Sequence, residues 1–265
     1  MPFGQTIAVT GLYPGFPGTI SRAGDGLTST RPVLSTTTNP VSFGAPVVIV
    51  PDASGGGDTI QSVSDFIAGA GIFYPALFAG VAVREVRSQA GTNVYPQNPE
   101  SPQTGQYLQG TLASVLERGT VPVIVNVGTP ASQIAVYIRT VANAGVPAGV
   151  VGGFECTPGA TDLFTIAVAT AAAAAGQKVI DVASTTNVQV GMAVSGHPGI
   201  PANAVVASFV ANTSITLNVN LTAAIPVGDL VTLSNLVQLP SVVFRSGVIG
   251  PVNQSDITLL NRTAA

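Results

Sequence analysis

Apolar residues along this chain occur in short runs that alternate with polar residues and are separated by turn-forming residues. The clearest run is Thr120–Val127, in which every second residue from Val121 to Val127 is a valine, the period of a strand with one face in a core. Pro122 lies inside this run and cannot donate a ladder hydrogen bond. We therefore predict an edge strand or a bulged strand here.

Other runs rich in Val, Ile, Thr and Phe predict further strands, and 30 glycines and 20 prolines punctuate them. The predicted strands are Val47–Val50, Val81–Val86, Ala135–Arg139, Asp162–Val168 and Ile257–Leu260. So many short strands are typical of an all-β sandwich, jelly roll or barrel.

One short helix is predicted from Asp58 onward. Asp58 followed by Gln61 has the form of a capping box, and apolar residues recur at helical spacing up to Ile67. We expect this helix to pack on the sheet.

Two segments show little periodicity. Residues 1–44 are rich in Gly, Pro and Thr, and a structureless stretch of this length is unusual inside a compact domain. We expect it to extend as an arm along a neighbouring molecule. Residues 91–110 predict an exposed loop, which could lie at an interface or simply at a mobile surface.

Residues 171–235 differ from the rest, because a tract of small residues is followed by five compact strand candidates. These are Lys178–Val182, Gly191–Gly196, Ala204–Val210, Ser214–Val219 and Leu230–Leu233. Insertions are tolerated at exposed loops whose ends lie close together. We therefore predict a small inserted β domain at 171–235, with residues 1–170 and 236–265 forming one discontinuous domain.

The composition is poor in charge: charged residues make up 8% of the chain, against about 25% in an ordinary soluble domain. Interface cores are depleted in charge, so this composition favours a subunit that is largely covered by partners, although some proteins tolerate a neutral surface. A net charge of −3 without a basic stripe argues against direct nucleic-acid binding. The apolar run 163–175 is too short to span a bilayer.

The N-terminus lacks the basic and apolar regions of a secretory signal, and the single cysteine, Cys156, fits assembly in a reducing cytoplasm. His197 is the only histidine, which disfavours a catalytic triad or a histidine metal site. A calcium site at Asp52 and Asp58 is less favoured than a turn followed by a helix cap. We predict no enzymatic activity, no metal and no cofactor.

Several segments resemble the structural cement (capsid decoration) proteins of tailed bacteriophages. The central resemblance covers Ser114–Val123, Val125–Pro130 and Ala135–Arg139, and others lie at Gly80–Val86, Val243–Gly247 and Asp256–Arg262. Residues 190–217 also resemble a small β module that is common in phage head and tail proteins, although His197-Pro198 departs from its usual shorter turn.

The resemblance implies a jelly-roll-like fold, a homodimer or homotrimer on the exterior of the virion head, and contacts that bridge neighbouring major capsid protein subunits. Assembly would take place in the cytoplasm of the host bacterium. A tail or fibre protein that binds a receptor or glycan is the alternative, disfavoured by the absence of tryptophan and of stalk repeats. Candidate capsid or subunit contacts are Phe3, Tyr13, Phe16, Arg22, Arg31, Glu117 and Arg118.

Overall fold

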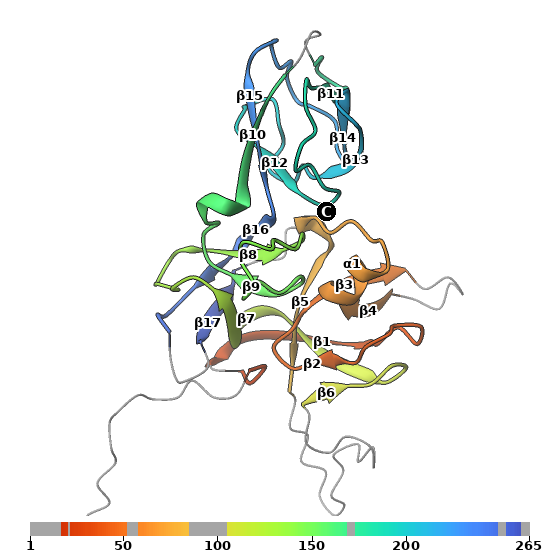
Figure 1. Cartoon of the computed structure of the whole chain (residues 1–265). Coiled ribbons are helices and arrows are strands. Elements are labelled where there is room, and N and C mark those ends of the chain that lie inside the picture. Colours follow the sequence, from red (N-terminus) through yellow and green to blue (C-terminus); the bar gives the residue numbers. More distant parts are fainter. Residues whose placement is uncertain are drawn as a thin grey trace, which may run out of the picture.

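The computed structural model describes residues 17–20, 22–51, 58–84, 105–168, 173–248 and 253–260. In Figure 1 a large β structure fills the lower part of the picture and a smaller group of strands stands above it. Nine strands of the lower part form one sheet. They are β1 (Arg22–Pro32), β3 (Pro46–Pro51), β4 (Asp58–Ser62), β5 (Phe78–Val83), β7 (Leu112–Val127), β8 (Ala135–Arg139), β9 (Phe154–Glu155), β16 (Leu236–Phe244) and β17 (Gln254–Leu259).

The centre of this sheet is β7, a strand of 16 residues whose two halves have different partners. Its first half pairs with β1 and β5, and its second half pairs with β17 and β9. Because β9, β8, β16 and β17 are also paired in that order, this half of the sheet closes into a barrel. The all-β fold predicted from the sequence is confirmed.

The other half of the sheet also curls back on itself. Beyond β5 come β3 and β4, and an isolated bridge from Val33 to Ile60 joins the end of β1 to β4. A small apolar cluster that includes Val33, Val47, Ile60 and Val115 lies inside this curl. A larger apolar cluster, called the barrel cluster below, includes Val81, Val121 and Phe244. Residues of α1 (Val63–Ala68) and η1 (Pro75–Leu77) also pack in it.

The upper group of strands, residues 163–235, is called the module below. It contains two three-stranded sheets, β10–β15–β12 and β11–β14–β13. Their bounds are β10 (Leu163–Ala167), β11 (Val179–Asp181), β12 (Ala193–Ser195), β13 (Val206–Val210), β14 (Ser214–Leu217) and β15 (Leu230–Ser234). The sheets enclose an apolar cluster of their own, which includes Ile180, Met192, Ile215, Ile225 and Leu233.

The predicted helix start at Asp58 is wrong by five residues. Residues 58–62 form β4, which pairs along its whole length with β3. The helix begins at Val63, and its cap is Ser62, whose hydroxyl accepts a hydrogen bond from the Asp65 amide at 3.2 Å. Pairing with β3 outweighs the local capping pattern, because it buries Ile60 completely.

The predicted arm, 1–44, is also partly corrected. Residues 22–32 form β1 and pair with β7, and Val41–Ser42 form β2, which pairs with β6 (Gln106–Tyr107). Residues 1–16, and all but the last part of the predicted loop 91–110, lie outside the described residues. The periodicity of β1 was obscured by its glycines and by two register shifts against β7.

Two predicted strands have partners other than those expected. Asp162–Val168 corresponds to β10, which pairs with β15 and so belongs to the module rather than to the barrel. The strand with Pro122 is central rather than at an edge, and the bulged alternative agrees with a register shift against β9 between Val125 and Val127. The carbonyl of Pro122 points away from β17 and accepts a hydrogen bond from the Gly18 amide. In a strand the N–H of a residue points to the same side as its carbonyl, so the N–H that proline lacks would also point away from β17, and no hydrogen bond to β17 is lost.

Candidate functional site

The candidate contact residues are distributed unevenly. Phe3, Tyr13 and Phe16 lie outside the described residues, and of Arg22 only the backbone is described, opposite Thr120 at the start of β1. The other three candidates are Arg31, Glu117 and Arg118, which lie on paired strands. The structure therefore brings part of the predicted set together across the β1–β7 ladder.

Arg31 and Glu117 form a charged cluster on the barrel surface. Nη2 of Arg31 donates to Oε1 of Glu117 at 3.1 Å, and the Ser29 hydroxyl donates to the same oxygen at 2.7 Å. Nη1 of Arg31 lies 3.5 Å from the Asp58 carboxylate. Glu117 is only 13% exposed and also lines a shallow groove with Phe78, Leu239 and Leu259. These contacts link side chains of β1, β4 and β7, and the groove lies beside them.

One end of the barrel, called the barrel base below, gathers chain segments that are distant in sequence. The Arg84 amide donates to the carbonyl of Gly18 at 2.8 Å, and the Phe43 amide donates to the carbonyl of Gly105 at 2.7 Å. The described chain thus begins at Pro17, stops at Arg84 and resumes at Gly105 within one region. The pair β2–β6, which adjoins Phe43 and Gly105 in sequence, lies at the end of the molecule opposite the module (Figure 1).

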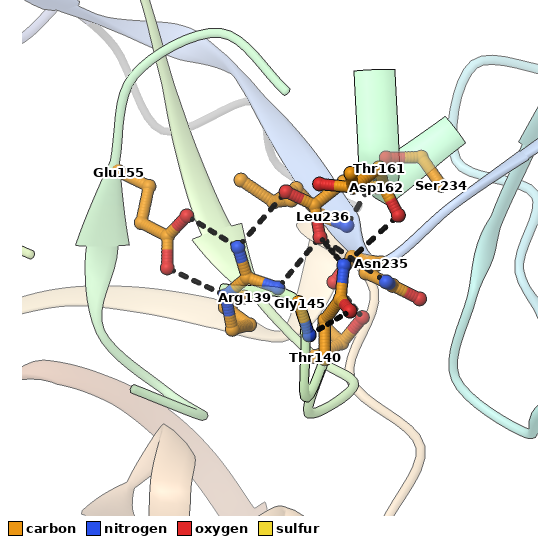
Figure 2. A network of polar contacts seen from close by, with 10 residues as sticks. Arg139, Thr140, Gly145, Glu155, Thr161, Asp162, Ser234, Asn235 and Leu236 are labelled. Carbon is orange, nitrogen blue, oxygen red and sulfur yellow. Dashed lines mark hydrogen bonds and ion pairs between the residues drawn. The ribbon is translucent and has the colours of Figure 1, made fainter. Parts of the chain in front are cut away.

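A second polar cluster lies where the barrel meets the module (Figure 2). Arg139, at the end of β8, is fully buried and lies between two carboxylates. Its Nε and Nη2 donate to Glu155 at 2.6 and 2.8 Å, and its Nη1 and Nη2 donate to Asp162 at 2.8 and 3.1 Å. Gly149 covers the guanidinium so closely that a Cβ at that position would lie 2.3 Å from Nε.

Amide side chains complete this network around Asp162. The side-chain NH₂ groups of Asn143 and Asn235 both donate to Oδ1 of Asp162, at 2.9 and 3.1 Å. Burial alone would raise the pKa of Asp162, but the hydrogen bonds from Arg139, Asn143 and Asn235 outweigh it and hold the pKa below its ordinary value. Both carboxylate partners likewise keep Arg139 charged, by raising its pKa against the effect of burial.

No local sequence pattern predicts this network. Arg139 and Glu155 lie 16 residues apart, and Arg139 and Asp162 lie 23 apart, so no local spacing joins them. A usable signal was Arg139 itself, which ends the apolar strand Ala135–Arg139 in a chain with few charges. An arginine in such a setting is seldom buried unless it is paired.

The residues considered for chemistry are not brought together. His197 lies in the module, where its Nε2 is 3.4 Å from the Asp229 carboxylate and its Nδ1 accepts the Gly199 amide. Asp52 lies outside the described residues, and Asp58 faces Arg31. Within the part of the chain that the structure describes, no three His, Cys, Asp or Glu side chains are grouped to hold a metal ion. The described helices include none long and apolar enough to cross a membrane.

We predict that Cys156 is nearly inert towards alkylation in the folded protein. Its thiol is buried, and burial, with a smaller effect of Glu155, raises its pKa to about 11. A thiolate is the reactive form, so at pH 8 the rate with iodoacetamide should be at least about a hundredfold below that of an ordinary thiol. Mass spectrometry gives the rate, and the exposed variant Ala224→Cys provides the comparison. Equal rates at the two positions would show that Cys156 is accessible and ionised.

Comparison with protein families gives a match over most of the chain. A model described as structural cement protein (E217 gp24/Pam3 gp6) matches residues 3–183. The match includes the central strand β7 and its partners β1 and β5, which precede it in the sequence. It ends inside the module, before β16 and β17. No curated protein matches the chain significantly.

Proposed function

The chain belongs to the structural cement protein family of bacteriophages, whose members are structural proteins of the virion, and from this we propose that it decorates the capsid exterior. In this proposal it binds neighbouring major capsid protein subunits, as a homodimer or homotrimer, and stabilises the shell. Binding that favours the assembled lattice over free subunits stabilises the lattice by mass action, and repetition over many sites multiplies the effect. Such a role requires complementary surfaces and no chemistry.

The single observation that carries the proposal is the family match, and the fold suggests which end faces the capsid. We propose that the barrel base lies on the capsid and that the module points outward. The chain enters the barrel base from residues 1–16, which contain no charged residue and include Phe3, Tyr13 and Phe16. Uncharged, aromatic segments are suited to the core of a protein interface.

The remaining candidate contacts fit the same orientation less directly. Arg22, Arg31, Glu117 and Arg118 belong to the β1–β7 ladder. Because Glu117 is mostly covered and already accepts two hydrogen bonds, we propose that it shapes the neighbouring groove, while the more exposed Arg118 meets a partner. Assembly in the host cytoplasm remains part of the proposal.

The test is a titration of empty, expanded heads with the purified protein, measured as copies per capsid. We expect saturation at a number commensurate with the icosahedral lattice. Removal of residues 1–16 should weaken binding roughly tenfold or more, since the loss of one aromatic anchor at an interface often costs about 2 kcal/mol. The truncation ends at residue 16 because Gly18 is hydrogen-bonded to Pro122 and Arg84 in the barrel.

A matched control changes the far end of the molecule instead. Val227 and Leu230 are exposed on the module, and the variant Val227→Ser with Leu230→Ser should bind heads like the unmodified protein. Absence of binding, or binding only at the number of capsid vertices, would favour the tail or receptor-binding alternative. Full binding by the truncated chain would show that residues 1–16 are not an anchor.

A further inference from the structure

The chain passes between barrel and module twice, and the two crossings lie side by side. The first passes through Asp162, just before β10, and the second through Asn235, between β15 and β16. The Asn235 amide donates to the carbonyl of Asp162 at 3.1 Å, and the side chains of the two residues are also hydrogen-bonded. Two adjacent crossings alone would act as one hinge, about which the module could rotate.

Arg139 anchors this hinge to the barrel. It lies on β8, and it binds Glu155 of the neighbouring barrel strand β9 with one side of the guanidinium and Asp162 with the other (Figure 2). All three side chains are at most 2% exposed. A bidentate guanidinium–carboxylate pair fixes direction as well as distance, so the crossing at Asp162 has one preferred position on the barrel.

A second set of contacts begins beside the crossing at Asn235, whose carbonyl accepts the Thr140 amide at 2.9 Å, and reaches other parts of the module, where it opposes rotation. The Thr140 hydroxyl donates to the carbonyl of Gly191 in the module at 2.7 Å. Apolar side chains are also exchanged: Val141 of the barrel side packs in the module cluster, and Val205 of the module packs in the barrel cluster. Both valines are at most 5% exposed, so rotation of the module would expose apolar surface on both sides.

We infer that these contacts form a rigid joint that holds the module at one orientation on the barrel, with Arg139 and Asp162 fixing the hinge and Thr140, Val141 and Val205 blocking rotation about it. The inference concerns the isolated chain and is independent of whether it binds capsids. Its consequence is that the module is presented in a fixed direction, so that a partner bound to it is held at a set place relative to the barrel.

The test measures a distance distribution across the joint. Spin labels are attached to Ala131→Cys on the barrel and Ala224→Cys on the module, two exposed positions, while the native Cys156 is buried. Double electron–electron resonance should give one narrow peak. The variant Asp162→Asn with Thr140→Val places an NH₂ group against the guanidinium and removes the hydroxyl that contacts the carbonyls of Gly191 and Asn235. We expect the narrow peak to be lost.

The control makes the same two chemical changes inside the module. In Asp229→Asn with Thr165→Val, the first residue faces His197 and the second is exposed on β10, so the narrow peak should persist. A broad distribution in the unmodified protein would overturn the inference. An unchanged peak in the joint variant with circular dichroism intact would also overturn it. If the joint variant does not fold, Thr140→Val alone, which changes no charge, carries the test with the same two outcomes.

Discussion

Substitution of Arg139 by methionine should lower the free energy of unfolding by about 3–5 kcal/mol, the usual cost of removing one partner from a buried ion pair. Methionine fills a similar volume but leaves the carboxylates of Glu155 and Asp162 buried without their shared cation. The two asparagines satisfy only Oδ1 of Asp162. Equilibrium unfolding in urea, followed by far-UV circular dichroism, measures the loss.

Two further variants show whether the loss comes from the network. Arg139→Lys keeps the charge, but a single ammonium group cannot bind two carboxylates in bidentate geometry, so an intermediate loss is expected. Lys178→Met removes an exposed cation from the module and should change the free energy of unfolding by no more than about 0.5 kcal/mol. If Arg139→Met were as stable as Lys178→Met, the network would contribute nothing to folding.

The strands and the buried network differ in how far they could be predicted from the sequence. Strands whose alternation is undisturbed, such as β8 and the module strands, were found close to their observed bounds because side-chain period alone identifies them. Arg139, Glu155 and Asp162 come together only when β8 pairs with β9 and the chain crosses into β10. No local pattern contains that information.

The wrong predictions share a physical cause. Around Asp58 the local signals favour a helix start, yet pairing of residues 58–62 with β3 buries Ile60 and decides the structure. At Asp162–Val168 the strand was found, but its partner, β15, lies more than 60 residues later in the chain. Strand partners are set by long-range packing, so the pairing of β10 with β15 could not be predicted from the local pattern.

Because β10 pairs with β15, the module can be removed between Asp162 and Asn235. A chain in which Asp162 is joined to Asn235 through Gly-Gly should fold as a barrel and bind phage heads as the full chain does. The backbones of these two residues are already hydrogen-bonded, so a short turn can connect them without moving β8, β9 or β16. Loss of the buried Val205 removes one apolar contact from the barrel cluster, which should lower the free energy of unfolding by about 2 kcal/mol.

A deletion of residues 172–235, which follows the boundary expected from sequence alone, is the informative comparison. It retains β10 but removes β15, and so leaves an unpaired strand with Phe164 and Ile166 deprived of the cluster against which they pack. It also removes Asn235 from the network around Asp162. Unpaired apolar strands promote aggregation, so this protein should be less soluble than the first deletion, as measured by size-exclusion chromatography. Failure of the first deletion to fold, with the second one soluble, would mean that β10 belongs to the barrel and that the module cannot be separated at Asp162 and Asn235.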